Sequence, residues 1–122
     1  MDERIKRALQ QDRTIDITTI GRKSGQPRRI EIWFHNLDDR IFITGLPGRR
    51  DWYANLKATP EFTFHLKESV QADLPATARA IVDEAERREL FTRLLKKLDR
   101  QADFDKWLAD SPLVEITVER RT

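Results

Sequence analysis

The sequence of 122 residues contains no cysteine, one methionine and one tyrosine. Without cysteine, the chain has no disulfide, no thiolate-bound metal and no cysteine nucleophile. It also lacks any apolar run near the ~20 residues that a membrane span requires. Its first eleven residues, MDERIKRALQQ, lack the apolar core of a signal peptide. We therefore expect a cytoplasmic protein without a transmembrane segment.

A strong excess of charge of one sign is also lacking. Lys and Arg number 23 and Asp and Glu number 21, which gives a formal net charge of +2. A dedicated nucleic-acid-binding protein carries a much larger positive excess, so we expect no nucleic-acid partner. The length and the 39% hydrophobic content predict one domain over residues 1–122, which begins with a short helix at residues 1–11.

Alternating apolar and polar residues predict six strands, and helical spacing follows residue 51 and residue 83. The strands are expected at residues 14–20, 28–36, 40–44, 61–67, 71–82 and 113–119. Mostly antiparallel strands with late helices indicate an α+β, mainly β fold: a small six-stranded barrel with helices packed around it. Closure of the barrel would also hide the strand edges.

The strand at residues 28–36 alternates with Ile30, Ile32 and Phe34 on one face. Trp33 and His35 then share the other face, which indicates an aromatic-lined pocket or an interface. His35 and His65 are expected to be half-exposed strand positions. A metal site would need a third ligand at defined spacing, and none stands out, so we expect no metal.

The first candidate site is the turn GRKSGQPRR at residues 21–29. Its cations surround a hydroxyl and exposed backbone amides, and such a turn can cradle a phosphate. The alternative is a solvated basic hairpin, and the spacing does not decide between them. The residues that would form the cradle are Arg22, Lys23, Ser24, Gly25, Arg28 and Arg29.

The second candidate site is the segment GLPGRRDWYANLKATP at residues 45–60. Asn55 lies one turn after Trp52, so both can face one cleft. The alternative is that Trp52 and Leu56 only anchor the helix. We find no catalytic nucleophile and no Ser–His–Asp pattern, so any redox chemistry would have to come from a cofactor.

The order of four segments resembles the deazaflavin-dependent nitroreductase and quinone reductase family of split β-barrel oxidoreductases. The segments are TTIGRKSGQPR, DWYANLKATP, QADLPATARAIVDEAERREL and PLVEITVE, and the resemblance extends from about Ile15 to Val118. It implies a split β-barrel that binds coenzyme F-420, an 8-hydroxy-5-deazaflavin with a phosphate and an oligoglutamate tail. It also implies hydride transfer from the reduced cofactor to a small conjugated acceptor: a quinone, an enone or a nitro compound.

The resemblance further implies roles for particular residues. The anionic tail would lie against Arg22, Lys23, Ser24, Gly25 and Arg28, with Arg49 adding a charge. The deazaflavin ring would lie against Trp52, Asn55 and Leu56. The acceptor would lie against Trp33, Phe104 and Trp107.

Three alternatives remain open at this point. The same basic turn could hold the phosphate of FMN. The pocket of a non-catalytic carrier could instead hold a fatty acid or a tetrapyrrole, and the basic hairpin could bind nucleic acid weakly. Relatives of this barrel often form homodimers through sheet faces, and the sequence does not define the oligomeric state.

Overall fold

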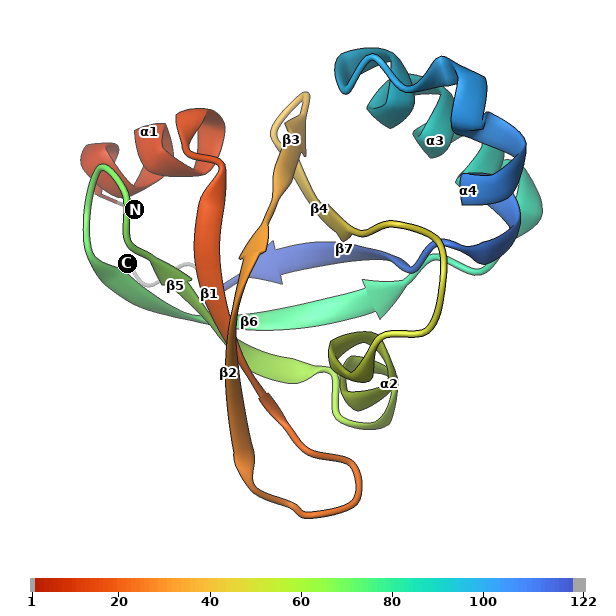
Figure 1. Ribbon diagram of the computed structural model, residues 1–122. Helices are drawn as coiled ribbons and strands as arrows, with labels where there is room; N and C mark the ends of the chain where they lie inside the picture. The colour runs from red at the N-terminus through yellow and green to blue at the C-terminus, as the bar shows by residue number, and fades with distance from the viewer. Residues whose placement is uncertain (1, 120–122) are drawn as a thin grey trace.

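The computed structural model describes residues 2–119, so residue 1 and residues 120–122 of the predicted domain lie outside the described part. The strands form one antiparallel sheet in the order β2-β1-β5-β6-β7-β4-β3. Figure 1 shows a strongly curled sheet, with α1 near one end and α3 and α4 together at the other. The predicted mainly β, split-barrel architecture is confirmed, with seven strands in place of six. The elements are α1 (Glu3–Gln11), β1 (Thr14–Ile20), β2 (Pro27–Trp33), β3 (His35–Leu37), β4 (Arg40–Thr44), α2 (Asp51–Ala58), β5 (Glu61–Leu66), β6 (Ala72–Ala80), α3 (Glu84–Lys97), the short 3-10 helix η1 (Gln101–Asp103), α4 (Phe104–Asp110) and β7 (Leu113–Val118).

The extra strand arises because the predicted strand at residues 28–36 breaks at Phe34. Trp33 still pairs with Thr14 of β1, whereas His35 pairs with Phe42 of β4. The chain thus passes from one edge of the sheet to the other, which produces the curl. The predicted alternation is wrong beyond the break, because Trp33 is 54% exposed while His35 is 8% exposed.

The sheet curls without closing, so the expectation that closure hides every edge is wrong. β2 pairs only with β1, over the register from Thr14 with Trp33 to Ile20 with Pro27. The β1–β2 hairpin projects from the rest of the molecule (Figure 1). Ile30, predicted on the core face, is consequently 37% exposed.

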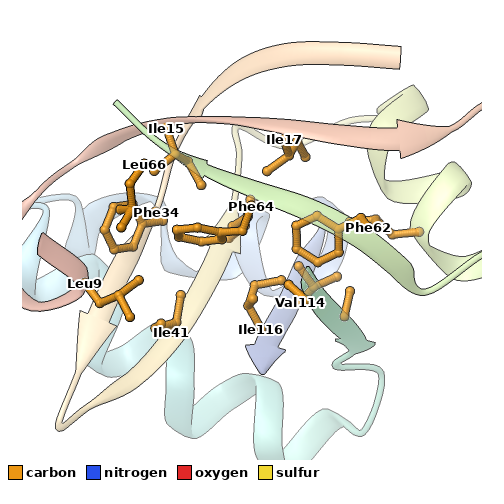
Figure 2. Packing of buried hydrophobic residues seen from close by; sticks show 14 of the residues in the cluster. Leu9, Ile15, Ile17, Phe34, Ile41, Phe62, Phe64, Leu66, Val114 and Ile116 are labelled. Carbon is orange, nitrogen blue, oxygen red and sulfur yellow. The ribbon is translucent and has the colours of Figure 1, made fainter. Parts of the chain in front are cut away.

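The larger core fills the concave side of the curled sheet, where side chains from β1, β4, β5 and β7 meet (Figure 2). Phe34 and Phe64 contact edge to face with ring centroids 5.4 Å apart. Ile15 and Ile17 are fully buried beside them. Truncating a buried phenylalanine such as Phe64 to alanine typically costs about 3–5 kcal/mol.

A second core lies between α3, α4 and the sheet. Asp83 caps α3 by accepting a hydrogen bond from the Glu86 N–H at 2.9 Å, and its spacing to Glu86 is that of a capping box. Leu90 and Leu94 then point into this core. Among the described residues, no helix has both the length and the apolar character needed to cross a bilayer.

Both histidines are buried, so the expectation of half-exposed positions is wrong. His65 lies between Thr18 Oγ1 and Asp73 Oδ1, each 2.7 Å from one of its ring nitrogens. Burial, together with the nearby charges of Lys97 and Arg13, lowers the pKa of His35 to about 4. At neutral pH the folded protein therefore keeps His35 uncharged.

This burial predicts a loss of stability in acid. The unfolded imidazole has a pKa of about 6.5, so acid protonates the unfolded chain before the folded one. Between pH 6.5 and 4 the free energy of unfolding should fall by about 3 kcal/mol from His35 alone. Urea unfolding of the wild type and of His35→Gln at pH 7 and pH 4 measures this difference. Equal losses in the two proteins would contradict the assignment.

Candidate functional site

The turn between β1 and β2 is held by its own backbone. The Gly21 N–H donates to Gln26 O and the Gly25 N–H donates to Gly21 O, both at 2.8 Å. Ser24 Oγ accepts from the Gln26 N–H at 3.1 Å. A Cβ on Gly21 would lie 2.5 Å from Ser24 Oγ, and Gly25 has a φ of +69°. A side chain at Gly21 would therefore displace the Ser24 hydroxyl, and the left-handed φ of Gly25 favours glycine.

A buried asparagine fastens helix α2 to this turn. Asn55 is 4% exposed, and its Oδ1 accepts from the backbone N–H and from Nη1 of Arg22, each at 3.0 Å. Arg22 Nη2 also lies 3.4 Å from Asp51 Oδ1 at the start of α2. The guanidinium of Arg22 thereby has a defined orientation beside the helix.

A cavity of about 550 Å³ lies between the turn and α2, and we call it the turn–helix cavity. Ile30 and Trp52 supply its large apolar side chains, whereas its cations belong to the turn. The structure thus brings together six of the residues predicted to bind a cofactor. The full lining is Thr19, Gly21, Arg22, Lys23, Ser24, Arg28, Ile30, Asp51, Trp52 and Asn55.

Two of these cations have no counter-charge. Within residues 2–119, neither Lys23 nor Arg28 has a carboxylate oxygen within 4.0 Å, and both residues are exposed. Arg22 is paired only with Asp51, whose side chain is 90% exposed. The turn–helix cavity therefore carries a net positive potential, which favours an anionic ligand.

The sequence analysis did not identify Thr19, Ile30 and Asp51 as individual lining residues, whereas Gly21 belongs to the predicted turn. Ile30 could have been found from the alternation along the strand, since residues 28 and 30 share one face and Arg28 was already a predicted site residue. Asp51 was interpreted only as the start of a helix. The contact between Asp51 and Arg22 depends on how the β1–β2 hairpin packs against α2, and the local sequence does not show that packing.

Three other predicted cofactor residues lie elsewhere. Leu56 is 2% exposed and belongs to the larger core, which supports the alternative that it anchors the helix. Gly25 shapes the turn without lining the turn–helix cavity. Arg49 lines a neighbouring cavity that shares Arg22 and Asp51 with the turn–helix cavity.

The three predicted acceptor residues do not gather at either cavity. Trp107 is 5% exposed in the second core, where it contacts Phe91 edge to face with centroids 6.2 Å apart. Phe104 packs against the same core. Their spacing of three residues is thus the apolar stripe of a short helix. Trp33 lies on the exposed edge strand β2.

The curled antiparallel sheet with helices at its ends has the split β-barrel architecture, and its cationic turn lies beside helix α2. A family model described as "F420H(2)-dependent quinone reductase" matches residues 1–120. The chain therefore belongs to this family, and it is a reductase that uses coenzyme F-420.

Solved structures with the same architecture include proteins of several kinds. The conserved hypothetical protein Rv2991 from Mycobacterium tuberculosis has a TM-score of 0.72 at 18% identity, covering 98% of this chain and 82% of its own. HutZ, the heme storage protein from Vibrio cholerae, has a TM-score of 0.69 at 18% identity, and the match covers 96% of this chain and 89% of HutZ. An F420-H2 dependent reductase, FDR-A, has a TM-score of 0.62 at 22% identity, and the match covers 88% of this chain and 95% of FDR-A. At these identities the likeness supports the fold.

The Asn55–Arg22 contact predicts energetic coupling between the helix and the turn. Replacing Asn55 by alanine leaves the Arg22 backbone N–H and guanidinium without their acceptor, and hydrogen bonds to a charged group contribute about 1.5–3 kcal/mol. In a double-mutant cycle of Asn55→Ala and Arg22→Ala, urea unfolding should give a coupling energy of about 1 kcal/mol or more. Strictly additive losses would contradict this role for Asn55.

Proposed function

We propose that the turn–helix cavity is the site of coenzyme F-420. The observation that supports this is that one cavity of about 550 Å³ combines an apolar wall with unpaired cations. Ile30 and Trp52 form the apolar wall, and the cations are Lys23 and Arg28. The cofactor has the same two parts, a flat ring and an anionic phosphate and glutamate tail. The residues present therefore fit the group.

Each part of the cavity has a separate task in this proposal. Lys23 and Arg28 bind the phosphate and carboxylates, while Trp52 packs against the ring and excludes water. Arg22 is already oriented by Asn55, so little side-chain freedom is lost when an anion binds. Reduced F-420 supplies a hydride and a proton, which together convert a quinone to its hydroquinone without any further reductant.

We infer that the acceptor is a quinone, since the family description names that class. The side chains that line the turn–helix cavity include no histidine and no cysteine. The protein therefore contributes by positioning the two reactants and shielding them from water. An assay with matched quinone, enone and nitro acceptors tests this inference, and faster turnover of an enone or a nitro compound would contradict it.

Removing either unpaired cation should weaken cofactor binding. Each charge-assisted hydrogen bond contributes about 1.5–3 kcal/mol, so Lys23→Ala and Arg28→Ala should each raise the Kd for F-420 by about tenfold or more. Fluorescence titration measures this, with FMN titrated in parallel. Lys96→Ala, an exposed cation on α3, is the matched control and should leave the Kd unchanged. Unaltered Kd in both turn variants, or tighter binding of FMN, would overturn the site.

We also propose that the chain forms a homodimer through the free edge of β2. Long exposed edge strands readily pair with a second chain. An antiparallel pairing of two copies centred on Ile30 would place Arg29 of each copy opposite Glu31 of the other, and opposite charges at facing positions are favourable. Trp33 would cover the end of this contact.

Sedimentation equilibrium tests the dimer. Trp33→Lys should shift the protein to a monomer, because it places an additional charge at the pairing edge. Val82→Lys changes another exposed apolar residue away from β2 and should leave the dimer intact. A monomeric wild type, or an unchanged dimer in Trp33→Lys, would contradict the proposal.

A further inference from the structure

A second cavity of about 1080 Å³ lies beside the first, between the loop at residues 47–50, α2 and α4. We call it the α2–α4 cavity. It shares Arg22 and Asp51 with the turn–helix cavity, so molecules in the two cavities would be neighbours. Its cationic side chains outnumber its two carboxylates, Asp51 and Asp110. The cations are Arg22, Arg49, Arg50, Lys57, Arg87 and Lys106.

Some of these cations already have a structural task. Arg50 donates to Leu46 O at 2.9 Å and to Arg49 O at 2.8 Å, which holds its own loop. Lys57 lies over the ring of Tyr53, 4.6 Å from the centroid. Within residues 2–119, neither Arg49 nor Lys106 has a carboxylate oxygen within 4.0 Å, so their charges remain free for a ligand.

Arg87 contributes a charge that no acid neutralises within the described residues. Its guanidinium donates only to backbone carbonyls, including Ile81 O at 3.0 Å and both Leu108 O and Ser111 O at 2.8 Å. These bonds cap the C-terminal end of α4. Burial lowers the pKa of Arg87, as expected for a cation withdrawn from water without a carboxylate partner.

A buried hydroxyl beside Arg87 is a second unusual feature of this cavity. Ser111 lines the α2–α4 cavity, is 3% exposed, and its Oγ has no hydrogen-bond partner among the described residues. A buried polar group without a partner carries a free-energy cost, and such groups are uncommon in folded proteins. Ser111 Oγ is itself buried, so an anionic ligand would accept a hydrogen bond from this hydroxyl once the cavity wall opens there, and the same ligand would offset the unpaired charges.

We propose that the α2–α4 cavity binds the anionic group of the acceptor, so that the enzyme prefers conjugated acceptors bearing a carboxylate or a sulfonate. This inference rests on the proposed function, because it requires the cofactor ring in the adjoining turn–helix cavity. The cofactor's own glutamate tail has the same chemistry. Lys23 and Arg28, the unpaired cations assigned to that tail, line only the turn–helix cavity, which favours the acceptor here.

The test compares 1,4-naphthoquinone-2-sulfonate with 2-methyl-1,4-naphthoquinone, which carries a methyl group at the same ring position. Calorimetric titration of the protein without cofactor should show binding of the sulfonate at least tenfold tighter than binding of the neutral quinone. This arm does not involve F-420, so its outcome is separate from that of the cofactor titration. Equal affinity for the two quinones would overturn the inference.

Two variants then locate the binding. Ser111→Ala and Lys106→Ala should each weaken sulfonate binding by about fivefold to tenfold, because each loses one hydrogen bond or ion pair to the anion. In both variants the affinity for the neutral quinone and the Kd for F-420 should stay unchanged. In the control Lys96→Ala the affinities for both quinones should stay unchanged. Ser111→Ala distinguishes ligand binding from a purely structural role. If the hydroxyl does not contact the ligand, removing it leaves sulfonate binding unchanged, and that result would contradict the role of Ser111.

The remaining outcome concerns the cofactor tail. If Ser111→Ala and Lys106→Ala raise the Kd for F-420 while the preference for the sulfonated quinone persists, the tail occupies the α2–α4 cavity. That result would overturn the acceptor assignment and leave the turn–helix cavity as the ring site.

Discussion

The buried amide of Asn55 is the contact on which the site depends. It joins two segments that lie 33 residues apart, the basic turn and helix α2, through two hydrogen bonds from Arg22. Because Asn55 is almost fully buried, water does not compete for these bonds, and their loss would leave polar groups unsatisfied. Without this contact the backbone N–H and guanidinium of Arg22 would lose their acceptor on α2, at the wall that the two cavities share.

The two adjoining cavities differ in their chemistry, and our proposal assigns the cofactor to one and the anionic group of the acceptor to the other. The turn–helix cavity combines apolar side chains with unpaired cations, whereas the α2–α4 cavity is mainly cationic. Clustered cations without counter-charges repel one another and reduce the stability of the folded protein. Their persistence around two adjoining cavities is typical of a site whose stabilising partners are ligands. Arg22 and Asp51 belong to both cavities and couple them physically.

The strand at residues 28–36 shows where local pattern fails. Its alternation holds through Trp33, because each residue there follows the pleat of one strand. At Phe34 the chain crosses from one sheet edge to the other, and His35 enters the interior instead of the Trp33 face. The late helices show the opposite case, since the three-residue spacing of Phe104 and Trp107 is that of an apolar helix face, and the structure packs both residues against the second core. Only the resemblance implied that they contact an acceptor.

Local sequence determined the turn at residues 21–29, the Asp83 cap and the helix and strand positions other than the break at Phe34, because these features follow from φ preferences and periodicity within a few residues. The resemblance to the family and the cationic turn could also be recognised from the sequence. The tertiary structure decided the Asn55–Arg22 contact, the burial of His35 and the orphaned hydroxyl of Ser111. Each of these depends on how far the sheet curls and which distant segments it brings together, and no short stretch of sequence contains that information.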